Sequence, residues 1–389
     1  MIYGKEKPGL LILGASGGVS GAFLQLIEEY RADFSSLILV DRVDTFTSSK
    51  YHNHALLDYT FLEEELTHEN CEEVLGGMIK KYDIQYILDN TDADTEPILA
   101  VADAHGASYL NCALNPMPSV EDFVEEIASL RKRYTNTKHV LGLGMNPGII
   151  NHFVLKLVSE YGVPKEFVEI EYESGKAAVA RDKPFITWSR AQFLYESVTA
   201  NTGYSHEGGA FHELKNNALS TTVDTQKYLE PIKKLDSYPR GMIVPHDEII
   251  MLSYDLGVPG KFVYAIHEES FSRLVDMVHM ADNKREVADH ELILEDNIHT
   301  PLTGSDCIGA WLYYDDKKVC YYMDVPHENH KGTNATLFLV AVGALAGLFD
   351  CMQDTSLEKQ VHFVSDLNTE NILKTVAKYA EIKKVVIEN

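Results

Sequence analysis

Residues 10–21, with the sequence LLILGASGGVSG, decide the fold of the first part of the chain. The four apolar residues at 10–13 predict a buried parallel strand, and apolar residues at helical spacing begin at Phe23. The glycine-rich turn between them is typical of dinucleotide-binding folds, in which a helix N-terminus supplies N–H donors to a pyrophosphate. The spacing departs from a strict GxGxxG pattern, so a glycine turn without a ligand remains the alternative. We expect a dinucleotide to contact Gly14, Ser16, Gly17, Gly18 and Val19.

Two further predicted strands end in polar residues that suit the same cofactor. The apolar run 36–40 ends at Asp41, 27 positions after Gly14. A carboxylate there accepts hydrogen bonds from an adenosine ribose and repels a 2′-phosphate, which favours NAD over NADP. Arg42 weakens this preference because it can pair with a phosphate, and a helix-cap or turn role for Asp41 is the alternative. The strand at 84–88 runs into residues that face the cofactor crevice in such folds, namely Asn90, Thr91 and Asp92.

Composition limits the class of protein. The chain has 389 residues, 45% hydrophobic and 24% charged, which suits a globular protein of two domains. A formal net charge of −25 argues against a nucleic-acid partner and suits a small cationic substrate. Five cysteines without a CxxC spacing predict reduced thiols and a cytoplasmic protein, and we expect no signal peptide. The uncharged run at 332–349 is expected to be a buried helix and not a membrane span.

The order of predicted elements indicates an α/β protein. Strands and helices alternate through residues 1–148, which predicts a Rossmann-type domain with a parallel sheet. Short alternating runs within 149–332 predict a second, α+β domain with a mixed or antiparallel sheet that has one solvent-facing side and binds the substrate. Residues 333–389 are expected to form C-terminal helices that pack back on the first domain.

Eight short motifs in a shared order carry a resemblance to a known family. They are NTDADT (90–95), NCALNP (111–116), GMNPGIINHF (144–153), IEYES (170–174), TWSRAQFLYE (187–196), MIVPHDE (242–248), FVYAIHE (262–268) and TNAT (333–336). Together they resemble the homospermidine synthase family, a branch of the saccharopine dehydrogenase-like oxidoreductases, over most of the chain. The resemblance implies a bound NAD that takes a hydride from an amine-bearing carbon of putrescine. A second amine then attacks the resulting imine and the same hydride returns, so there is no net oxidation.

The resemblance also implies catalytic roles for His246, Trp188, Glu196, Glu171, Asp94 and Asn146. A hydride leaves readily only from a carbon that bears a neutral amine, so a base is needed. His246 fits that role, with His267 as the runner-up, because imidazole titrates near neutral pH. The ring of Trp188 would stabilise an iminium cation, carboxylates would pair the distal ammonium, and the Asn146 amide would orient substrate or nicotinamide. Structural alternatives are a histidine at a strand end, a core tryptophan and solvated carboxylates.

Two departures from the family pattern leave the exact substrate open. Asn115 stands before Pro116 where the family has a glutamate, and a neutral amide cannot pair an ammonium as a carboxylate does. The glycine turn departs from the family form as well. A second enzyme class is reductive condensation of an amine with a carbonyl, as in saccharopine or carboxynorspermidine dehydrogenases, which use NADPH. Their carboxylate substrates would need basic residues such as Arg181, Lys183 and Arg190.

Other expectations concern partners. A cofactor-binding sensor without turnover is a third functional class. The histidines of VPHENHKG, His327 and His330, are interpreted as an exposed loop, and no metal site is predicted. We expect a small, putrescine-like amine as the substrate, neither a membrane nor a nucleic acid as a partner, and a homodimer by default.

Overall fold

The chain divides into two compact units. The computed structural model describes residues 7–44, 58–116, 118–119, 122–177, 185–280, 293–294, 302–330 and 332–388. Unit 1 comprises Met1–Ile149 and Phe338–Val376, and unit 2 comprises Ile150–Leu337 and Ala377–Asn389.

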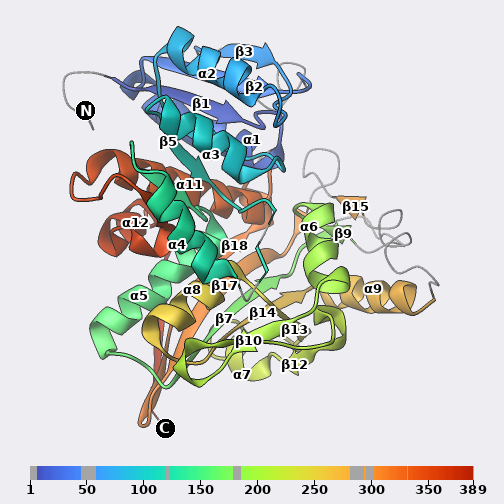
Figure 1. Cartoon of the computed structure of the whole chain (residues 1–389). Helices are drawn as coiled ribbons and strands as arrows, with labels where there is room; N and C mark the ends of the chain where they lie inside the picture. The colour runs from blue at the N-terminus through green and yellow to red at the C-terminus, as the bar shows by residue number, and fades with distance from the viewer. Residues whose placement is uncertain are drawn as a thin grey trace. The chain divides into compact units, whose positions relative to one another are not determined.

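Unit 1 is built on a seven-stranded sheet in which every neighbouring pair of strands is parallel (Figure 1). The spatial order is β19 (Val361–Phe363), β6 (His139–Leu141), β5 (Ser108–Asn111), β4 (Ile84–Asp89), β1 (Gly9–Leu13), β2 (Ser36–Asp41) and β3 (Thr60–Glu63). Strand β1 is buried along its whole length, as expected for an apolar strand covered on both faces. The predicted Rossmann-type sheet is thereby confirmed.

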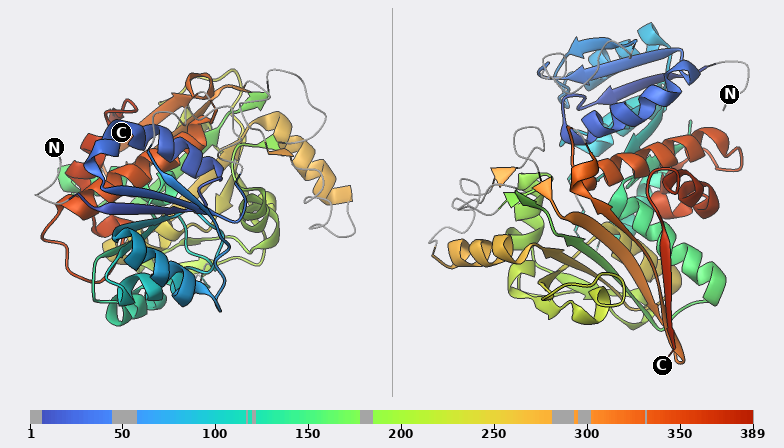
Figure 2. Two further views of the ribbon diagram at one scale, coloured as in Figure 1. Left: turned by 90° about the horizontal axis from the view of Figure 1, so that it is seen from above. Right: turned by 180° about the vertical axis from the view of Figure 1, so that it is seen from behind.

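Helices lie on both faces of this sheet. Helix α1 (Gly18–Ile27) covers one face, and α2 (Cys71–Tyr82) and α3 (Thr95–Ala104) cover the other (Figure 2). Unit 1 also contains α4 (Phe123–Arg133), most of α11 (Ala335–Gln353) and α12 (Thr369–Val376).

Helix α11 forms part of the core. In the described part of the chain, it alone is long and apolar enough to cross a membrane, but 78% of its most apolar window is buried inside the protein. Glycines let it pack closely, because a Cβ on Gly343 would collide with the Gly144 backbone and one on Gly347 with the Leu143 side chain. The predicted buried helix is confirmed.

The order in which successive strands are added to the sheet reverses between β1 and β4. Strands β2 and β3 follow β1 on one side, whereas β4, β5 and β6 extend the sheet on the other. Ligands of such sheets bind in the crevice outside the carboxyl ends of the strands at this switch point. Gly14 follows β1 and Asn90 follows β4, and the Asn90 N–H donates to the Leu13 carbonyl at 3.1 Å. Two predicted cofactor-binding segments therefore meet there.

Unit 2 is built on a second seven-stranded sheet of mixed direction. Its order is β12 (Thr222–Asp224), β13 (Arg240–Val244), β14 (Gly260–Ile266), β7 (Glu166–Glu173), β17 (Ser305–Tyr313), β18 (Lys317–Pro326) and β20 (Lys383–Glu388). Strands β14 and β7 are parallel, and the other neighbours are antiparallel. The long strand β18 lies between the long strand β17 and the edge strand β20 (Figure 2). The predicted mixed sheet is confirmed.

Shorter elements complete unit 2. Among the described residues of unit 2 are the helices α5 (Ile150–Tyr161), α6 (Arg190–Leu194), α7 (Gln226–Leu229), α8 (Asp247–Leu256) and α9 (Glu268–Met280). Three two-stranded pairs are β10 (Gly203–Ser205) with β11 (Phe211–Glu213), β8 (Lys176–Ala177) with β16 (Leu302–Thr303), and β9 (Phe185–Ile186) with β15 (Ile293–Leu294).

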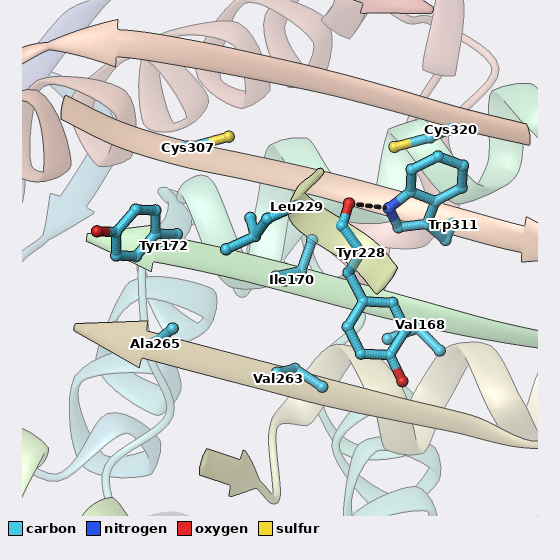
Figure 3. Packing of buried hydrophobic residues seen from close by; sticks show 10 residues of the cluster. All are labelled: Val168, Ile170, Tyr172, Tyr228, Leu229, Val263, Ala265, Cys307, Trp311 and Cys320. Atoms are coloured by element: carbon cyan, nitrogen blue, oxygen red, sulfur yellow. Dashed lines mark hydrogen bonds between the residues drawn. The ribbon is translucent and has the colours of Figure 1, made fainter. Parts of the chain in front are cut away.

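The second sheet has one apolar and one acidic face at its centre. On the apolar face, alternate residues of β7 pack with side chains of β14, β17, β18 and α7, and the Trp311 indole N–H donates to the Tyr228 carbonyl at 3.0 Å (Figure 3). Side chains alternate along a strand, so the intervening residues of β7 project from the opposite face. That face is also buried at β7 and β17. The expectation of one solvent-facing side is therefore wrong for these central strands.

The C-terminal segment contains strands where only helices were expected. Strand β19 extends the parallel sheet beside β6, and β20 forms the edge of the mixed sheet beside β18. Burial alternates along β20 from Val385 onward, which is typical of an edge strand with one half-buried face. Strand β19 has only three residues and gives no period to detect.

Candidate functional site

The glycine turn after β1 has the geometry of a phosphate-binding loop. Gly14 has a φ of +71°, which favours glycine, and a Cβ there would lie 2.7 Å from the Asn90 carbonyl oxygen. Gly17 and Gly18 are exposed at the start of α1. Among the described residues, no side chain caps this helix, and its first turn contains no acidic residue. The turn therefore suits the pyrophosphate of a dinucleotide.

Asp41, at the end of β2, is held against the glycine turn. The Ser16 N–H donates to Asp41 Oδ2 at 2.9 Å, and the Ser16 hydroxyl donates to the Val43 carbonyl at 2.8 Å. Val19 is half-buried in the first turn of α1, and Arg42 is exposed. The Asp41 carboxylate thus lies beside the turn at the carboxyl end of the sheet, where an acidic residue binds ribose hydroxyls in dinucleotide-binding folds.

The residues after β4 connect this end of the sheet to α1. Asn90 Nδ2 donates to Ser20 Oγ at 2.9 Å, and Asn90 Oδ1 accepts from the Cys112 thiol at 3.3 Å. The Thr91 hydroxyl donates to the buried Asp89 carboxylate at 2.7 Å. Asn90 and Thr91 therefore hold the loop at the mouth of the crevice in one arrangement.

Four other residues considered in the sequence also belong to unit 1. Asp92 is exposed, as is Asp94, whose side chain makes no capping hydrogen bond to α3 within the described residues. Asn146 is half-buried in the non-helical turn between β6 and α5. Asn115 Nδ2 donates to the Thr91 carbonyl at 3.3 Å. The Asn115 amide therefore supports the loop after β4.

Strand β7 carries a row of three buried carboxyl groups. Glu169, Glu171 and Glu173 are 0%, 4% and 3% exposed, and they project from the same face because they alternate along the strand. Register places Glu169 opposite Phe262 and Glu171 opposite Tyr264 on β14. Sequence reasoning found only Glu171. Acidic residues at every second position are typical of a strand with one solvated face, so no signal in the sequence indicated that this face is closed.

His246 is the centre of an acidic cluster at the start of α8. Its Nδ1 lies 2.6 Å from Glu248 Oε2, and its Nε2 lies 3.9 Å from Glu196 Oε2. Asp247 and Glu248 occupy the first turn of α8, where acidic side chains interact favourably with the helix dipole. The imidazole packs on the ring of Phe262, with centroids 4.6 Å apart. The structure therefore brings together two predicted residues, His246 and Glu196, and adds Glu248 to them.

Glu196 reaches this cluster from a turn of π-helix, Tyr195–Thr199, that follows α6. Such turns are frequent at functional sites. Gln192 Nε2 donates to Glu196 Oε1 at 2.6 Å and fixes the carboxylate. The side chains of Glu196 and His246 are 12% and 14% exposed, whereas that of Glu248 is 0% exposed. The cluster thus has an accessible edge and a closed interior.

Burial and the neighbouring carboxylates set the charge of His246. Burial by itself lowers the imidazole pKa, but Glu248, followed by Glu196 and Asp247, outweighs it and raises the pKa to about 10. Burial raises the pKa of Glu196 and brings that of Asp247 to about 7. At neutral pH His246 is therefore an imidazolium, which cannot accept a further proton.

Trp188 is fixed by a chain of hydrogen bonds. Its indole N–H donates to the Tyr264 hydroxyl at 3.0 Å, and that hydroxyl donates to Glu173 Oε2 at 2.6 Å. The indole makes edge-on contacts with Phe193 and Tyr264, at centroid distances of 5.9 and 6.2 Å. Trp188 is half-buried, unlike the fully buried Trp311. Tyr264 is also the cross-strand neighbour of Glu171. Through Tyr264, the indole is therefore connected to the row of carboxyl groups on β7.

Asp306 of β17 extends this row. It lies opposite Glu173 in the sheet register, and its Oδ2 accepts from the Thr336 hydroxyl at 2.6 Å. Its Oδ1 has no hydrogen-bond partner in the described part of the chain. Burial and, secondarily, the Glu173 charge raise the pKa of Asp306 to about 7. Sequence reasoning did not identify Asp306.

The remaining candidates lie outside these clusters or outside the described residues. Arg181 and Lys183 fall outside the described residues, and Arg190 is exposed. His267 is half-buried, and burial lowers its pKa. His327 is fully buried, and its Nδ1 accepts from a backbone N–H, so the expected exposed loop is wrong at this position. Within the described residues there is no group of three or more potential ligands arranged to hold a metal.

Comparisons with known proteins identify a shared fold. No protein-family profile and no curated protein sequence matches this chain. It is similar to the solved structure of homospermidine synthase from Legionella pneumophila in complex with NAD, with a TM-score of 0.77 and 15% identity over 98% of this chain and 92% of that one. GenD2 from gentamicin A biosynthesis, in complex with NAD, gives a TM-score of 0.44 and 11% identity over 100% and 98% of the two chains. At such identities the first likeness establishes the fold alone.

Proposed function

We propose that this protein is an NAD-dependent enzyme that forms polyamines through an imine, as its resemblance to the homospermidine synthase family implies. The observation that carries the proposal is the accessible edge of the acidic cluster in unit 2, where Glu196 Oε2 lies 3.9 Å from His246 Nε2 and the two side chains are 12% and 14% exposed. Such an arrangement suits a cationic amine, because a buried ammonium needs carboxylates to balance its charge.

The cofactor part of the proposal rests on unit 1. The uncapped start of α1 and the positive φ of Gly14 fit a pyrophosphate, and the carboxylate of Asp41 fits the ribose of NAD. The NAD bound in the solved structure of homospermidine synthase, which shares this fold, supports the same choice of cofactor. When bound, NAD would accept a hydride from the amine-bearing carbon and return it.

We assign the two accessible groups of the acidic cluster different proton roles. Glu196, whose pKa is raised by burial, would accept the proton that leaves the substrate ammonium before hydride transfer. His246 enters the cycle already protonated, so it would donate a proton from Nε2 to the leaving amine. In this assignment Glu196 replaces His246 as the base, and His246 acts as the acid.

Trp188 would hold the cationic intermediate. A half-buried indole can place its ring face against an iminium, an interaction of about 0.5–2 kcal/mol. The hydrogen bonds through Tyr264 to Glu173 fix the indole plane, so its contribution would not require ordering on substrate binding.

The alternative proposal is reductive condensation of an amine with a carbonyl compound that carries a carboxylate. Such a substrate needs buried basic groups to pair its carboxylate. Arg190, one of the residues considered for this role, is exposed, and the groups that surround His246 are acidic. We therefore rank this second candidate below the first.

The test is incubation of the protein with NAD and putrescine deuterated on both nitrogen-bearing carbons, followed by mass spectrometry of the amines. We expect a longer polyamine that retains deuterium from the reacting carbon, without net formation of NADH. Consumption of NADPH with an amine and a carboxylated carbonyl compound would favour condensation instead. NAD binding without turnover of either substrate set would indicate a sensor.

A further inference from the structure

Two buried glutamates near His246 have oxygens without partners. Glu169 is 0% exposed, and neither of its carboxyl oxygens has a hydrogen-bond partner in the described part of the chain. Glu248 is also 0% exposed; its Oε2 pairs with His246, but within the same residues its Oε1 has no partner. Three buried carboxyl oxygens therefore require an explanation, because an unpaired buried charge is very costly.

Both glutamates are linked to Phe262 on the acidic face of the mixed sheet, Glu169 by strand register and Glu248 through its hydrogen bond with His246. Glu169 on β7 lies opposite Phe262 on β14, and the His246 ring packs on Phe262. After burial, the charge of Glu248 is the main influence that raises the pKa of Glu169, and His246 opposes it. The other titratable groups around this point are Glu171 on the same strand, Asp247 on α8 and Glu196 on the π-helical turn.

The burial of these carboxyl oxygens determines which kind of cation can pair with them. An ammonium or a metal ion needs contact with the carboxylate oxygens, and such contact requires atoms that a molecule of water size can reach. Glu169 and Glu248 are fully enclosed, whereas Glu196 and His246 retain 12% and 14% side-chain exposure. A proton is the one cation that needs no such access, and two adjacent carboxyl groups in a dry site share a proton more readily than both ionise.

We infer that Glu169 is a neutral carboxylic acid at pH 7 that donates a hydrogen bond to Glu248 Oε1 and thereby holds Glu248 against His246. Glu169 is then a positioning residue, because it acts on the imidazolium through another side chain. Both oxygens of Glu248 are then paired, one with Glu169 and the other with His246 Nδ1. The consequence for turnover, a correctly aimed His246 Nε2, rests on the proposed function; the hydrogen-bond arrangement does not.

The test compares the His246 pKa, measured by NMR titration of the imidazole, among variants of the whole chain. Glu169→Gln keeps the shape and a neutral donor, so we expect the His246 pKa to stay within about 0.5 unit of wild type. Glu169→Leu removes the donor, and Glu248→Gln removes a negative charge; we expect each to lower the His246 pKa by about one unit or more. Glu166→Gln, at the outer end of the same strand, is the matched control and should change nothing.

The result that overturns the inference is a large fall of the His246 pKa in Glu169→Gln, because only a charged Glu169 would produce it. Should Glu169→Leu fail to fold, infrared difference spectra of wild type against Glu169→Gln at pH 7 give a second measurement. We expect the carbonyl band of one protonated carboxyl group in the wild type only, and its absence would equally contradict a neutral Glu169. Neither measurement depends on turnover, so failure of the proposed function would leave both outcomes readable.

Discussion

His246 Nδ1 and Glu248 Oε2 are joined by a 2.6 Å hydrogen bond across the start of α8. Glu248 is fully enclosed and His246 is nearly so, hence water screens this charged pair only weakly. The unfolded chain has no such pairing, and its histidine binds a proton with the ordinary affinity. The difference in proton affinity between the two states makes the pair a source of pH-dependent stability.

We expect the free energy of unfolding to fall as pH rises from about 6.5 to about 10. The folded pKa of His246 is raised to about 10 from 6.5, so its stabilising contribution is fully present below the lower value and is lost through the upper one. The slope contributed by this one proton approaches about 1.4 kcal/mol per pH unit. Urea unfolding between pH 7 and 9 measures it.

His246→Gln should flatten this dependence, whereas His206→Gln, at an exposed histidine, should not. Equal slopes in wild type and His246→Gln would show that the imidazolium is not what the folded state stabilises. The absolute stability of His246→Gln is also expected to be lower at pH 7, because Glu248 then loses its charged partner.

Tyr264 is the link between Trp188 and the carboxylate row, and Tyr264→Phe removes that link alone. The indole N–H and Glu173 Oε2 each lose a partner, which we expect to cost about 1–3 kcal/mol of unfolding free energy. In a Trp311→Phe background, Trp188 is the sole tryptophan, and acrylamide quenching of its emission excited at 295 nm should increase because the indole is no longer fixed. Unchanged quenching would mean that Phe193 and the backbone suffice to hold the ring.

The parallel sheet of unit 1 could be predicted because its signal is local. The apolar run 10–13 is short, and the glycines that follow it end the run at a defined point, which favours a covered strand over a buried helix. Strands β3 and β19 were missed because they contain only four and three residues. Their place in the sheet depends on distant partners, β2 and β6, and not on a period within their own sequences.

The candidate site was predicted only in part, because its closure is a property of tertiary structure. The sequence named Glu171 but not Glu169 or Glu173, since an alternating acidic strand looks the same whether or not other elements cover it. His246 was identified, but its role was based on an unperturbed imidazole. Among its neighbours, Glu248 raises the His246 pKa most, and it lies only two residues away in the same motif. Its approach to His246 Nδ1 depends on the backbone turn that begins α8, and the sequence pattern does not predict that turn.

Gly18→Asp tests the proposed cofactor site of unit 1. The start of α1 contains no acidic residue, and an added carboxylate there would repel a pyrophosphate and compete for the same N–H groups. We expect NAD affinity to fall by at least about tenfold, with thermal stability unchanged or slightly raised. Gln25→Glu adds the same charge further along α1 and is the matched control. Equal weakening by both variants would point to net charge and not to the glycine turn.

Glu196→Gln separates the proposed amine site from the cofactor site. Gln retains the shape but cannot take the proton that must leave the substrate ammonium, so we expect diamine turnover to fall by about 100-fold or more. NAD affinity should barely change, because the groups proposed to bind NAD are the glycine turn and Asp41, and Glu196 is not among them.

The matched control for this variant is Glu213→Gln, at an exposed carboxylate of β11 in the same unit, which should leave turnover and NAD affinity as in wild type. Loss of NAD affinity in Glu196→Gln would place that carboxylate at the cofactor and remove it from the amine site. Full turnover in Glu196→Gln would instead transfer the proton-accepting role to another carboxyl group. Asp247 is the next group to test, because its pKa of about 7 suits a base at neutral pH.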